Sequence, residues 1–316
     1  MAEKKATREA LGNGLKAIGA SMPDLVVLTA DLAETTRVEY FRREFPDRFF
    51  NCGIQEENMM GVAAGLAAAG KTVFASTFAM FAAGRAFEQI RNSIAYPGLN
   101  VKIAATHAGI SVGEDGASHQ CNEDIGLMRT LPGMTIVNPA DYTEALRAVE
   151  ACARVKTPCY LRFGRAAVPD LSAEEAGYRF ELGRGRLLRE GRDVTVVATG
   201  LTVSMALEAA KLLAAEGVSA EVVNIHTIKP LDGELICRSA AKTGCVVTAE
   251  EHNVIGGLGS AIAEALSENC PVPLVRVGMP DCWGESGPAA ALLERYGLSP
   301  ANIARQAGAA IAKKKA

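Results

Sequence analysis

The chain lacks the features that would suit it to nucleic acid, to a membrane or to secretion. Its 33 Lys and Arg are outnumbered by 36 Asp and Glu, which leaves a net charge of −3 and no basic excess for phosphodiester backbones or anionic lipid. No apolar run is both long and uncharged enough to span a bilayer, and the first residues lack the apolar core of a signal peptide. We therefore expect a cytoplasmic protein that binds neither nucleic acid nor membranes.

Patterns of cysteine and histidine that would hold a metal are also missing. The eight Cys include no C-x-x-C pair, and the four His have no ligand spacing. Reduced thiols are the simplest explanation of the scattered cysteines, and we predict no metal ligands in this chain. The one basic run, Lys313 to Lys315, is expected to be a solvated, disordered tail.

The sequence does have ample apolar content, 49% of residues, with aromatics at only 5%, so Ala, Val, Leu and Ile must fill its cores. A length of 316 residues predicts two domains or three. Short apolar runs alternate with helical patterns, which predicts parallel sheets covered on both faces. Strands are predicted at 25–29, 49–51, 72–75, 101–105, 134–137 and 158–162, and helices at 6–21, 55–69, 79–95, 123–130 and 141–154.

A polar, Gly-rich stretch from Pro169 to Arg192 interrupts this pattern and reads as a linker. A second α/β block follows, with strands at 194–198, 219–224 and 244–248 and helices at 203–216 and from 256–259 to 268. The fold class is therefore α/β, with two doubly wound, mostly parallel-sheet domains. The predicted boundaries are 1–170, a linker at 171–192, and 193–316.

The run Gly256 to Gly259 is a weak phosphate-loop signal at the start of a helix. It lacks the full dinucleotide spacing and the acid that should follow it. We therefore expect these glycines to serve tight packing of a strand against a helix.

Candidate site residues gather where the predicted strands of the first block end. Asn51 to Met59 reads as a strand end, a Gly turn and a helix that opens on Glu56 and Glu57. Acids in a first helical turn are favoured by the macrodipole, so a well-capped core helix accounts for both on composition alone. However, an aromatic pair follows the next strand and two His-bearing loops follow the one after. The carboxyl ends of strands are where an open α/β sheet builds its site.

Five segments resemble, in order and spacing, the pyrimidine-binding domain of transketolase. They are Gly53-Ile54-Gln55-Glu56, Ser76-Thr77-Phe78, Thr106-His107, Gly113-Glu114-Asp115-Gly116 and Ser118-His119-Gln120. Thr199-Gly200, Lys229-Pro230-Leu231 and Glu250-Glu251-His252-Asn253 resemble the C-terminal domain of the same thiamine-diphosphate family. The resemblance covers nearly the whole chain.

The family's Gly-Asp-Gly segment with a downstream Asn, which holds the cofactor's diphosphate through a metal, has no match here. The resemblance therefore implies the second half of a split transketolase, inactive alone. The diphosphate-binding N-terminal half, with Mg²⁺ (or Ca²⁺ or Mn²⁺), should be a separate chain, and two copies of each half are the expected assembly. The implied reaction belongs to pentose phosphate metabolism. It moves a two-carbon ketol unit from a ketose phosphate to an aldose phosphate through a carbanion–enamine on thiamine diphosphate.

The resemblance assigns Glu56 as the acid that activates the cofactor through N1′ of its aminopyrimidine. A carboxylic acid in an apolar wall suits this, because burial raises its pKa and strengthens the bond to the ring. Glu57 is a rival by composition. Asp31 matches a family acid near the thiazolium, and it could equally cap the following helix.

Phe78 and Phe81 match the family's apolar slot for the pyrimidine ring. The third aromatic of that slot would fall at Gly84, a departure from common transketolases. Phe87, one helical turn later, could replace it, and ordinary core packing explains Phe87 about as well.

Substrate groups follow from the same resemblance. His107 matches a hydroxyl-binding His, Asp115 an acceptor of the C2 hydroxyl, and His119 a His on the phosphate side. Three further residues match positions that hold a sugar phosphate, for which the Arg fork is suited: Arg8, Thr35 and Arg165. Arg162 is a nearby competitor for Arg165.

Three alternatives stay open. The related deoxyxylulose-phosphate synthase is favoured by the segment Arg85-Ala86-Phe87-Glu88-Gln89. Against it, this chain has His107 where the similar segment of the synthase has Arg. The β subunit of a 2-oxo acid dehydrogenase also pairs with a separate cofactor half, but lacks the Gly-Glu-Asp-Gly and His-Gln loop. A non-catalytic regulatory subunit would not need Glu56, His107, Asp115 and His119 together.

Overall fold

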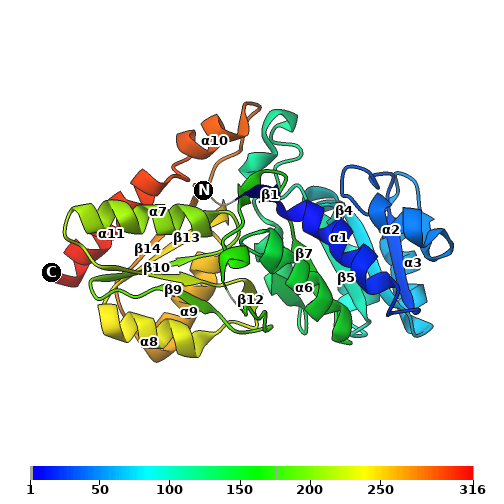
Figure 1. Cartoon of the computed structure of the whole chain (residues 1–316), viewed down its shortest axis with the longest axis horizontal. Helices are drawn as coiled ribbons and strands as arrows, with labels where there is room; N and C mark the ends of the chain where they lie inside the picture. The colour runs from blue at the N-terminus through cyan, green and yellow to red at the C-terminus, as the bar shows by residue number, and fades with distance from the viewer. Residues whose placement is uncertain (1–2, 176, 316) are drawn as a thin grey trace.

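A computed structural model describes residues 3–175 and 177–315, which form two α/β sheets side by side, each covered by helices on both faces (Figure 1). The fold class predicted from the sequence is confirmed. The first sheet has seven strands in the order β12-β6-β7-β5-β4-β2-β3, parallel except for the edge strand β12. Its strands are β2 (Leu25–Thr29), β3 (Phe49–Asn51), β4 (Thr72–Phe78), β5 (Val101–Thr106), β6 (Thr135–Val137), β7 (Cys159–Arg162) and β12 (Thr227–Lys229).

The central strands of this sheet are apolar because both of their faces are covered. Every residue of β2, β4, β5 and β7 is buried, as expected of a parallel sheet between two helix layers. One face packs on α1, α2 and α6 and the other on α3, the segment 80–95 and α5. The helices are α1 (Thr7–Gly19), α2 (Glu39–Glu44), α3 (Glu56–Ala68), α5 (Asp124–Arg129) and α6 (Tyr142–Arg154).

The second sheet has five strands in the order β14-β13-β10-β11-β9, with only β9 antiparallel. Helices α7 and α11 lie on one face, and α8 and α9 on the other (Figure 1). The strands are β9 (Arg186–Arg189), β10 (Val194–Ala198), β11 (Ala220–Asn224), β13 (Val246–Asn253) and β14 (Leu274–Met279). The helices are α7 (Thr202–Ala215), α8 (Gly233–Thr243), α9 (Leu258–Asn269), α10 (Ala289–Arg295) and α11 (Pro300–Lys315).

The two sheets are joined more closely than the sequence suggested. Strand β12 follows β11 in the chain but pairs with β6 of the first sheet, and one apolar core cluster contains residues packed on both sheets. Strand β9 of the second sheet lies within the segment expected to be a linker. A short antiparallel pair, β1 (Lys4–Ala6) and β8 (Ala167–Pro169), ties the N-terminus to the end of the first block.

One local expectation is confirmed only in part, and another is wrong. The predicted helix at 79–95 is two π-helical segments, η2 (Met80–Arg85) and η3 (Ile90–Ala95), around the short helix α4 (Phe87–Gln89). The tail expected to be disordered belongs to helix α11, and Lys314 Nζ donates to the carbonyl of Thr243 at 2.6 Å. None of the described helices is long and apolar enough to cross a membrane.

Candidate functional site

The candidate residues lie along one edge of the seven-stranded sheet. Strands β3, β2, β4, β5 and β7 are neighbours and parallel, so their carboxyl ends meet at that edge. Asp31 follows β2, Phe78 ends β4, His107 follows β5, and Arg165 follows β7. Glu56 opens α3 shortly after β3.

An aromatic cluster forms where β4 runs into η2. The rings of Phe78 and Phe81 are stacked with centroids 5.5 Å apart, and His107 stacks on Phe78 at 4.0 Å. His119 meets the ring of Phe81 edge-on at 5.5 Å. Such pairs offer a flat apolar surface to a planar ring. Strand β5 and the loop after it therefore bring both histidines to the aromatic pair.

No aromatic ring occupies the position expected for the third aromatic of the slot, which is Gly84. Gly84 is exposed, and a Cβ added there would come within 2.1 Å of Met80 Cε. Phe87 is half-buried and packs against the apolar core cluster. Ordinary packing therefore accounts for Phe87.

The ring of His107 is held from both nitrogens. Arg8 donates from Nη1 to His107 Nε2 at 2.9 Å, so Nε2 is the acceptor and Nδ1 carries the proton, with Thr106 Oγ1 2.9 Å away as its acceptor. Arg8 Nη1 also donates to the backbone carbonyl of Thr35 at 3.1 Å. Burial, with Arg8 and Arg165 as further causes, lowers the pKa of His107 to about 3. His107 is thus a neutral residue in a cationic setting.

The cations around His107 have few counter-ions. Arg37 is paired with Glu9 at 2.7 Å, and Arg165 lies 3.5 Å from Glu114. Arg8 has no carboxylate within ion-pair distance among the described residues, and its buried Nε has no hydrogen-bond partner there. Burial and the nearby Arg37 lower the pKa of Arg8. The cations around His107 are therefore arranged to attract an anion.

Glu56 and Glu57, which composition could not separate, differ in the structure. Glu56 is buried at 3% exposure and Glu57 is exposed. The Oε2 atom of Glu56 has no hydrogen-bond partner among the described residues, and the nearest cation is Arg85 Nε at 3.9 Å. Helix α3 packs on η2, which carries both Arg85 and Phe81. A buried carboxylate oxygen without a donor is costly, so this atom is suited to a donor from outside the chain.

Asp31 is fixed by Asn51 across the ends of β2 and β3. Asn51 Nδ2 donates to Asp31 Oδ1 at 3.0 Å, and Asn51 Oδ1 accepts from the backbone N–H of Asp31 at 2.9 Å. Asp31 has a positive φ of 61° and does not begin a helix. The capping alternative is therefore excluded for Asp31. Nothing in the sequence pattern indicated Asn51.

Arg162, the competitor of Arg165, is a structural residue. Its guanidinium is buried and donates to both oxygens of Asp124, at 2.8 and 3.2 Å, and to the carbonyl of Glu251 at 2.9 Å. Burial opposes the charge, yet Asp124 raises the pKa of Arg162. Arg165 is half-exposed and donates to the carbonyl of Val112 in the loop after β5. Of the two, only Arg165 is exposed enough to contact a ligand.

Asp115 and His119 lie in a loop that the second domain supports. Gln120, at the end of this loop, donates to the carbonyl of Gly113 at 3.0 Å and to that of Glu285 at 2.8 Å. Asp115 is exposed, whereas His119 is half-buried against the aromatic pair. The second domain therefore contacts the loop through a hydrogen bond from the Gln120 side chain to a backbone carbonyl.

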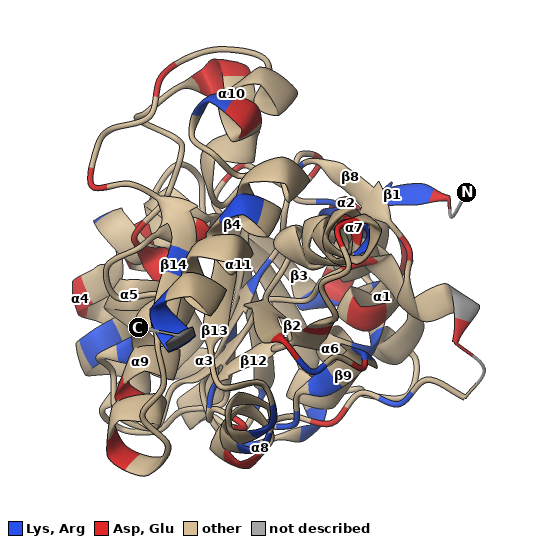
Figure 2. Cartoon of the chain, turned by 90° about the vertical axis from the view of Figure 1, so that its left-hand side faces the viewer, with Lys and Arg blue, Asp and Glu red and all other residues tan. Residues whose placement is uncertain are grey.

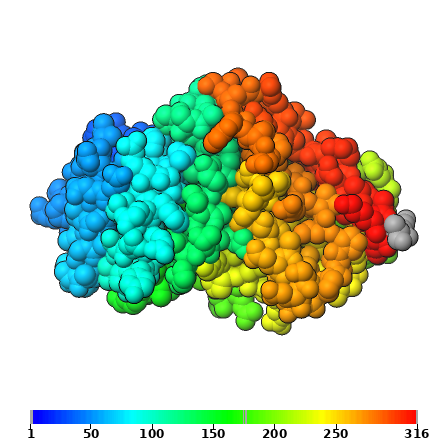
Figure 3. All heavy atoms as spheres, turned by 180° about the vertical axis from the view of Figure 1, so that it is seen from behind, coloured from blue at the N-terminus to red at the C-terminus, as the bar shows by residue number. Residues whose placement is uncertain are grey.

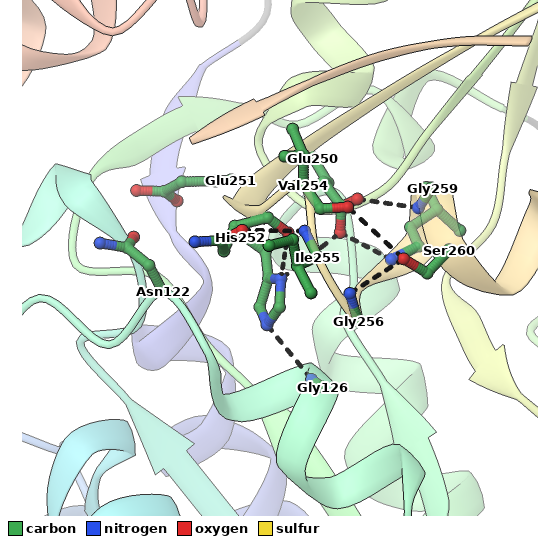
Figure 4. Close-up of polar contacts among 12 residues, drawn as sticks. Asn122, Gly126, Glu250, Glu251, His252, Val254, Ile255, Gly256, Gly259 and Ser260 are labelled. Atoms are coloured by element: carbon green, nitrogen blue, oxygen red, sulfur yellow. Dashed lines mark hydrogen bonds and ion pairs between the residues drawn. The ribbon is translucent and has the colours of Figure 1, made fainter. Parts of the chain in front are cut away.

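The glycines at 256–259 serve packing, as expected from the sequence. The buried carboxylate of Glu250 accepts from the backbone N–H groups of Leu258 and Gly259, at 2.6 and 2.8 Å, at the N-terminus of α9 (Figure 4). A protein side chain thus fills the position that a phosphate would take. Burial raises the pKa of Glu250 to about 7.

We predict that Gly257→Ala destabilises the chain. A Cβ there would lie 2.0 Å from Glu250 Oε2, and the Glu250 carboxylate cannot move without losing its backbone donors Leu258 and Gly259. Such overpacking costs about 1–3 kcal/mol, measurable as a lower urea midpoint. Gly308→Ala, on the exposed side of α11 with nothing within 4 Å, is the control and should be neutral or mildly stabilising. Equal midpoints for the two variants would contradict the packing role.

The described residues contain no group of three or more His, Cys, Asp or Glu side chains that could hold a metal ion.

Comparisons with known proteins find similarity over most of the chain. A family model of the transketolase pyrimidine-binding domain matches residues 3–170, and one of the transketolase C-terminal domain matches residues 183–303. A putative transketolase C-terminal section from Methanocaldococcus jannaschii is 48% identical over 96% of this chain and 95% of its own length. A 6-deoxy-6-sulfo-D-fructose transketolase subunit from a Clostridium species is 47% identical over 90% and 87%.

One solved structure is also similar to nearly the whole of this chain. A structure described as a split gene transketolase, inactive beta4 tetramer, superposes with a TM-score of 0.91 at 55% identity. The superposition covers 98% of this chain and 99% of that one. The similarity therefore extends over both sheets.

Proposed function

This chain belongs to the transketolase family, and on that premise we propose that it is the cofactor-activating subunit of a split transketolase. A separate chain would supply the diphosphate-binding half, and the pair would transfer a two-carbon ketol unit between sugar phosphates. Relatives described as a C-terminal section and as a subunit support the division into two chains.

The observation that carries the proposal is the buried Glu56 carboxylate, whose Oε2 has no donor among the described residues. Thiamine diphosphate, on which this family depends, has a planar aminopyrimidine that can donate such a hydrogen bond when N1′ is protonated. Phe78 and Phe81 offer the apolar surface for that ring. The unpartnered Glu56 oxygen and the surface formed by Phe78 and Phe81 together fit the aminopyrimidine of thiamine diphosphate.

When bound, the cofactor supplies the carbon that accepts and delivers the ketol unit. Glu56 would accept a hydrogen bond from protonated N1′ and so orient the ring, and its burial would strengthen that bond. Asp31, held by Asn51, would supply negative charge to balance the thiazolium. Mg²⁺, Ca²⁺ or Mn²⁺ would be held mainly by the partner chain.

The geometry favours a different division of the two histidines from the one expected from the sequence. His107 contacts Arg8 and lies among the cations, which suits the phosphate side of a sugar. His119 lies against Phe81, close to where the cofactor ring would stack, which suits a substrate hydroxyl. Asp115, in the same loop, would accept from a neighbouring hydroxyl. Arg8, Thr35 and Arg165 keep their expected role beside the phosphate.

We expect Arg165→Ala to raise the KM for phosphorylated sugars about tenfold or more, because charge-assisted hydrogen bonds contribute about 1.5–3 kcal/mol each. Unphosphorylated sugars should be used as before, and kcat should change little. Steady-state kinetics of the assembled enzyme, with the surface variant Arg154→Ala as control, measure this. If both classes of sugar suffer alike, Arg165 does not bind phosphate.

The proposal is tested by native co-purification. A tagged chain should retain a partner that carries the family's Gly-Asp-Gly segment with a downstream Asn, in a complex with two copies of each. Thiamine diphosphate should bind in the mixture and not to either chain alone. Absence of a partner together with absence of cofactor binding would instead favour a regulatory subunit. A cytoplasmic location would be checked by fractionation of the source cells.

A further inference from the structure

A cavity of about 410 Å³ lies between the two domains, beside the loop that carries Asp115 and His119. Gln120, Asn122 and Glu123 line it from the first domain, and Asp281 and Trp283 from the second. Figure 3 shows the chain around residue 115 in green-blue beside the orange chain that leads to α10. We name this cavity the Trp283 pocket.

Two residues that line the Trp283 pocket carry a buried hydrogen-bond acceptor without a donor among the described residues. Gln120 and Asn122 are 3% and 9% exposed, and Gln120 Oε1 and Asn122 Oδ1 both lack a partner among the described residues. The amide nitrogen of Gln120 is already used, because it donates to the carbonyls of Gly113 and Glu285. Buried carboxamide oxygens are rarely left unpaired, so both point to a donor from outside.

The charge of the Trp283 pocket and its exposed aromatic ring indicate which kind of donor group would bind there. Glu123 and Asp281 contribute two carboxylates, and none of the described residues that line the pocket is basic. Figure 2 shows acidic residues, in red, on α10 and on the loops next to it. Trp283, 83% exposed, offers a flat aromatic face at the rim. A guanidinium matches all three features, since it is cationic, has five donors and no acceptor, and stacks on indole.

We propose that the Trp283 pocket receives an arginine side chain of the diphosphate-binding partner subunit. The guanidinium stacks on Trp283 and pairs with Asp281, and Asn122 turns its buried oxygen toward the guanidinium to accept an N–H. This inference rests on the proposed function, since it takes the partner from there. A partner chain is the occupant because the pocket adjoins a site that lacks its diphosphate half, and an exposed Trp beside desolvated polar groups is typical of interface hot spots.

The first test uses the isolated full-length chain. Trp283 is its only tryptophan, so intrinsic fluorescence reports on the pocket alone. N-acetyl-arginine amide should give a saturable change, and the uncharged N-acetyl-citrulline amide should not. Asp281→Asn and Asn122→Leu should each weaken the arginine response at least tenfold. Equal responses to the two amides, or none to either, overturn the guanidinium assignment.

The second test measures affinity for the co-purified partner. Trp283→Ala, Asp281→Asn and Asn122→Leu should each weaken assembly at least tenfold, with thiamine diphosphate affinity of the fully assembled pair unchanged. Tyr96→Ala, which removes another aromatic that is 90% exposed, is the control and should assemble normally. Unchanged assembly in the pocket variants overturns the partner assignment, even if the arginine probe binds. Weakened assembly of a pair that transfers no ketol unit supports this inference while rejecting the proposed function.

Discussion

Glu56→Gln should lower the turnover of the assembled enzyme at least a hundredfold while leaving the affinity for thiamine diphosphate within a few-fold of wild type. A general acid–base group contributes about 10²–10⁴-fold to rate, and Gln keeps the shape of the side chain but cannot take up or release the proton. The unpartnered Oε2 atom is where that proton would be held. Single-turnover ketol transfer and isothermal titration with the cofactor separate the two effects.

The matched control for this variant is the adjacent acid. Glu57 is exposed and begins the same helix, so Glu57→Gln changes the same charge at the same helix terminus without touching the buried position. Its turnover should stay close to wild type. Turnover close to wild type in Glu56→Gln would remove Glu56 from the mechanism.

Asp124→Ala is expected to be the most destabilising single change in the chain. Asp124 is fully buried, and it accepts from Arg162 and from the Tyr160 hydroxyl, the latter at 2.8 Å. Removing it leaves a buried guanidinium without its counter-ion, which costs about 3–5 kcal/mol. The urea midpoint and the melting temperature of the isolated chain should both fall.

Two comparisons separate this effect from a general loss of charge. Arg154→Ala breaks an ion pair with Glu150 in which the Arg side chain is 73% exposed, and such pairs contribute about 0.2–1 kcal/mol. The double variant Asp124→Leu with Arg162→Leu should recover much of the loss, because the buried guanidinium is then removed together with its counter-ion. A double variant no more stable than Asp124→Ala would show that packing, not charge, holds this region.

The sequence predicted the parallel sheets because their strands are continuous apolar runs and their helices have polar faces. The edge of the sheet that gathers the candidate residues followed from the same alternation. Strand β12 was not predictable in this way: it is three residues long, and it pairs with a strand some ninety positions earlier in the chain. The π-helical segments at η2 and η3 also escape a pattern that assumes 3.6 residues per turn.

Within the candidate site, residue type alone could not separate neighbours. Glu56 and Glu57 are the same residue type, and the structure distinguishes them by burial. Arg162 and Arg165 differ because a buried Asp from another element meets one of them. Contacts such as Asn51 with Asp31 depend on how strand ends are juxtaposed, which a single sequence does not carry.

The central claim is that this chain, with a partner, transfers a two-carbon ketol unit. The most direct measurement supplies the reconstituted pair with thiamine diphosphate, Mg²⁺, a ketose phosphate labelled with ¹³C at C1 and C2, and an aldose phosphate acceptor. The account predicts that NMR finds both labels at C1 and C2 of a product two carbons longer than the acceptor, and only when both chains are present. Transfer by this chain alone, or no transfer by a pair that binds the cofactor, would contradict it.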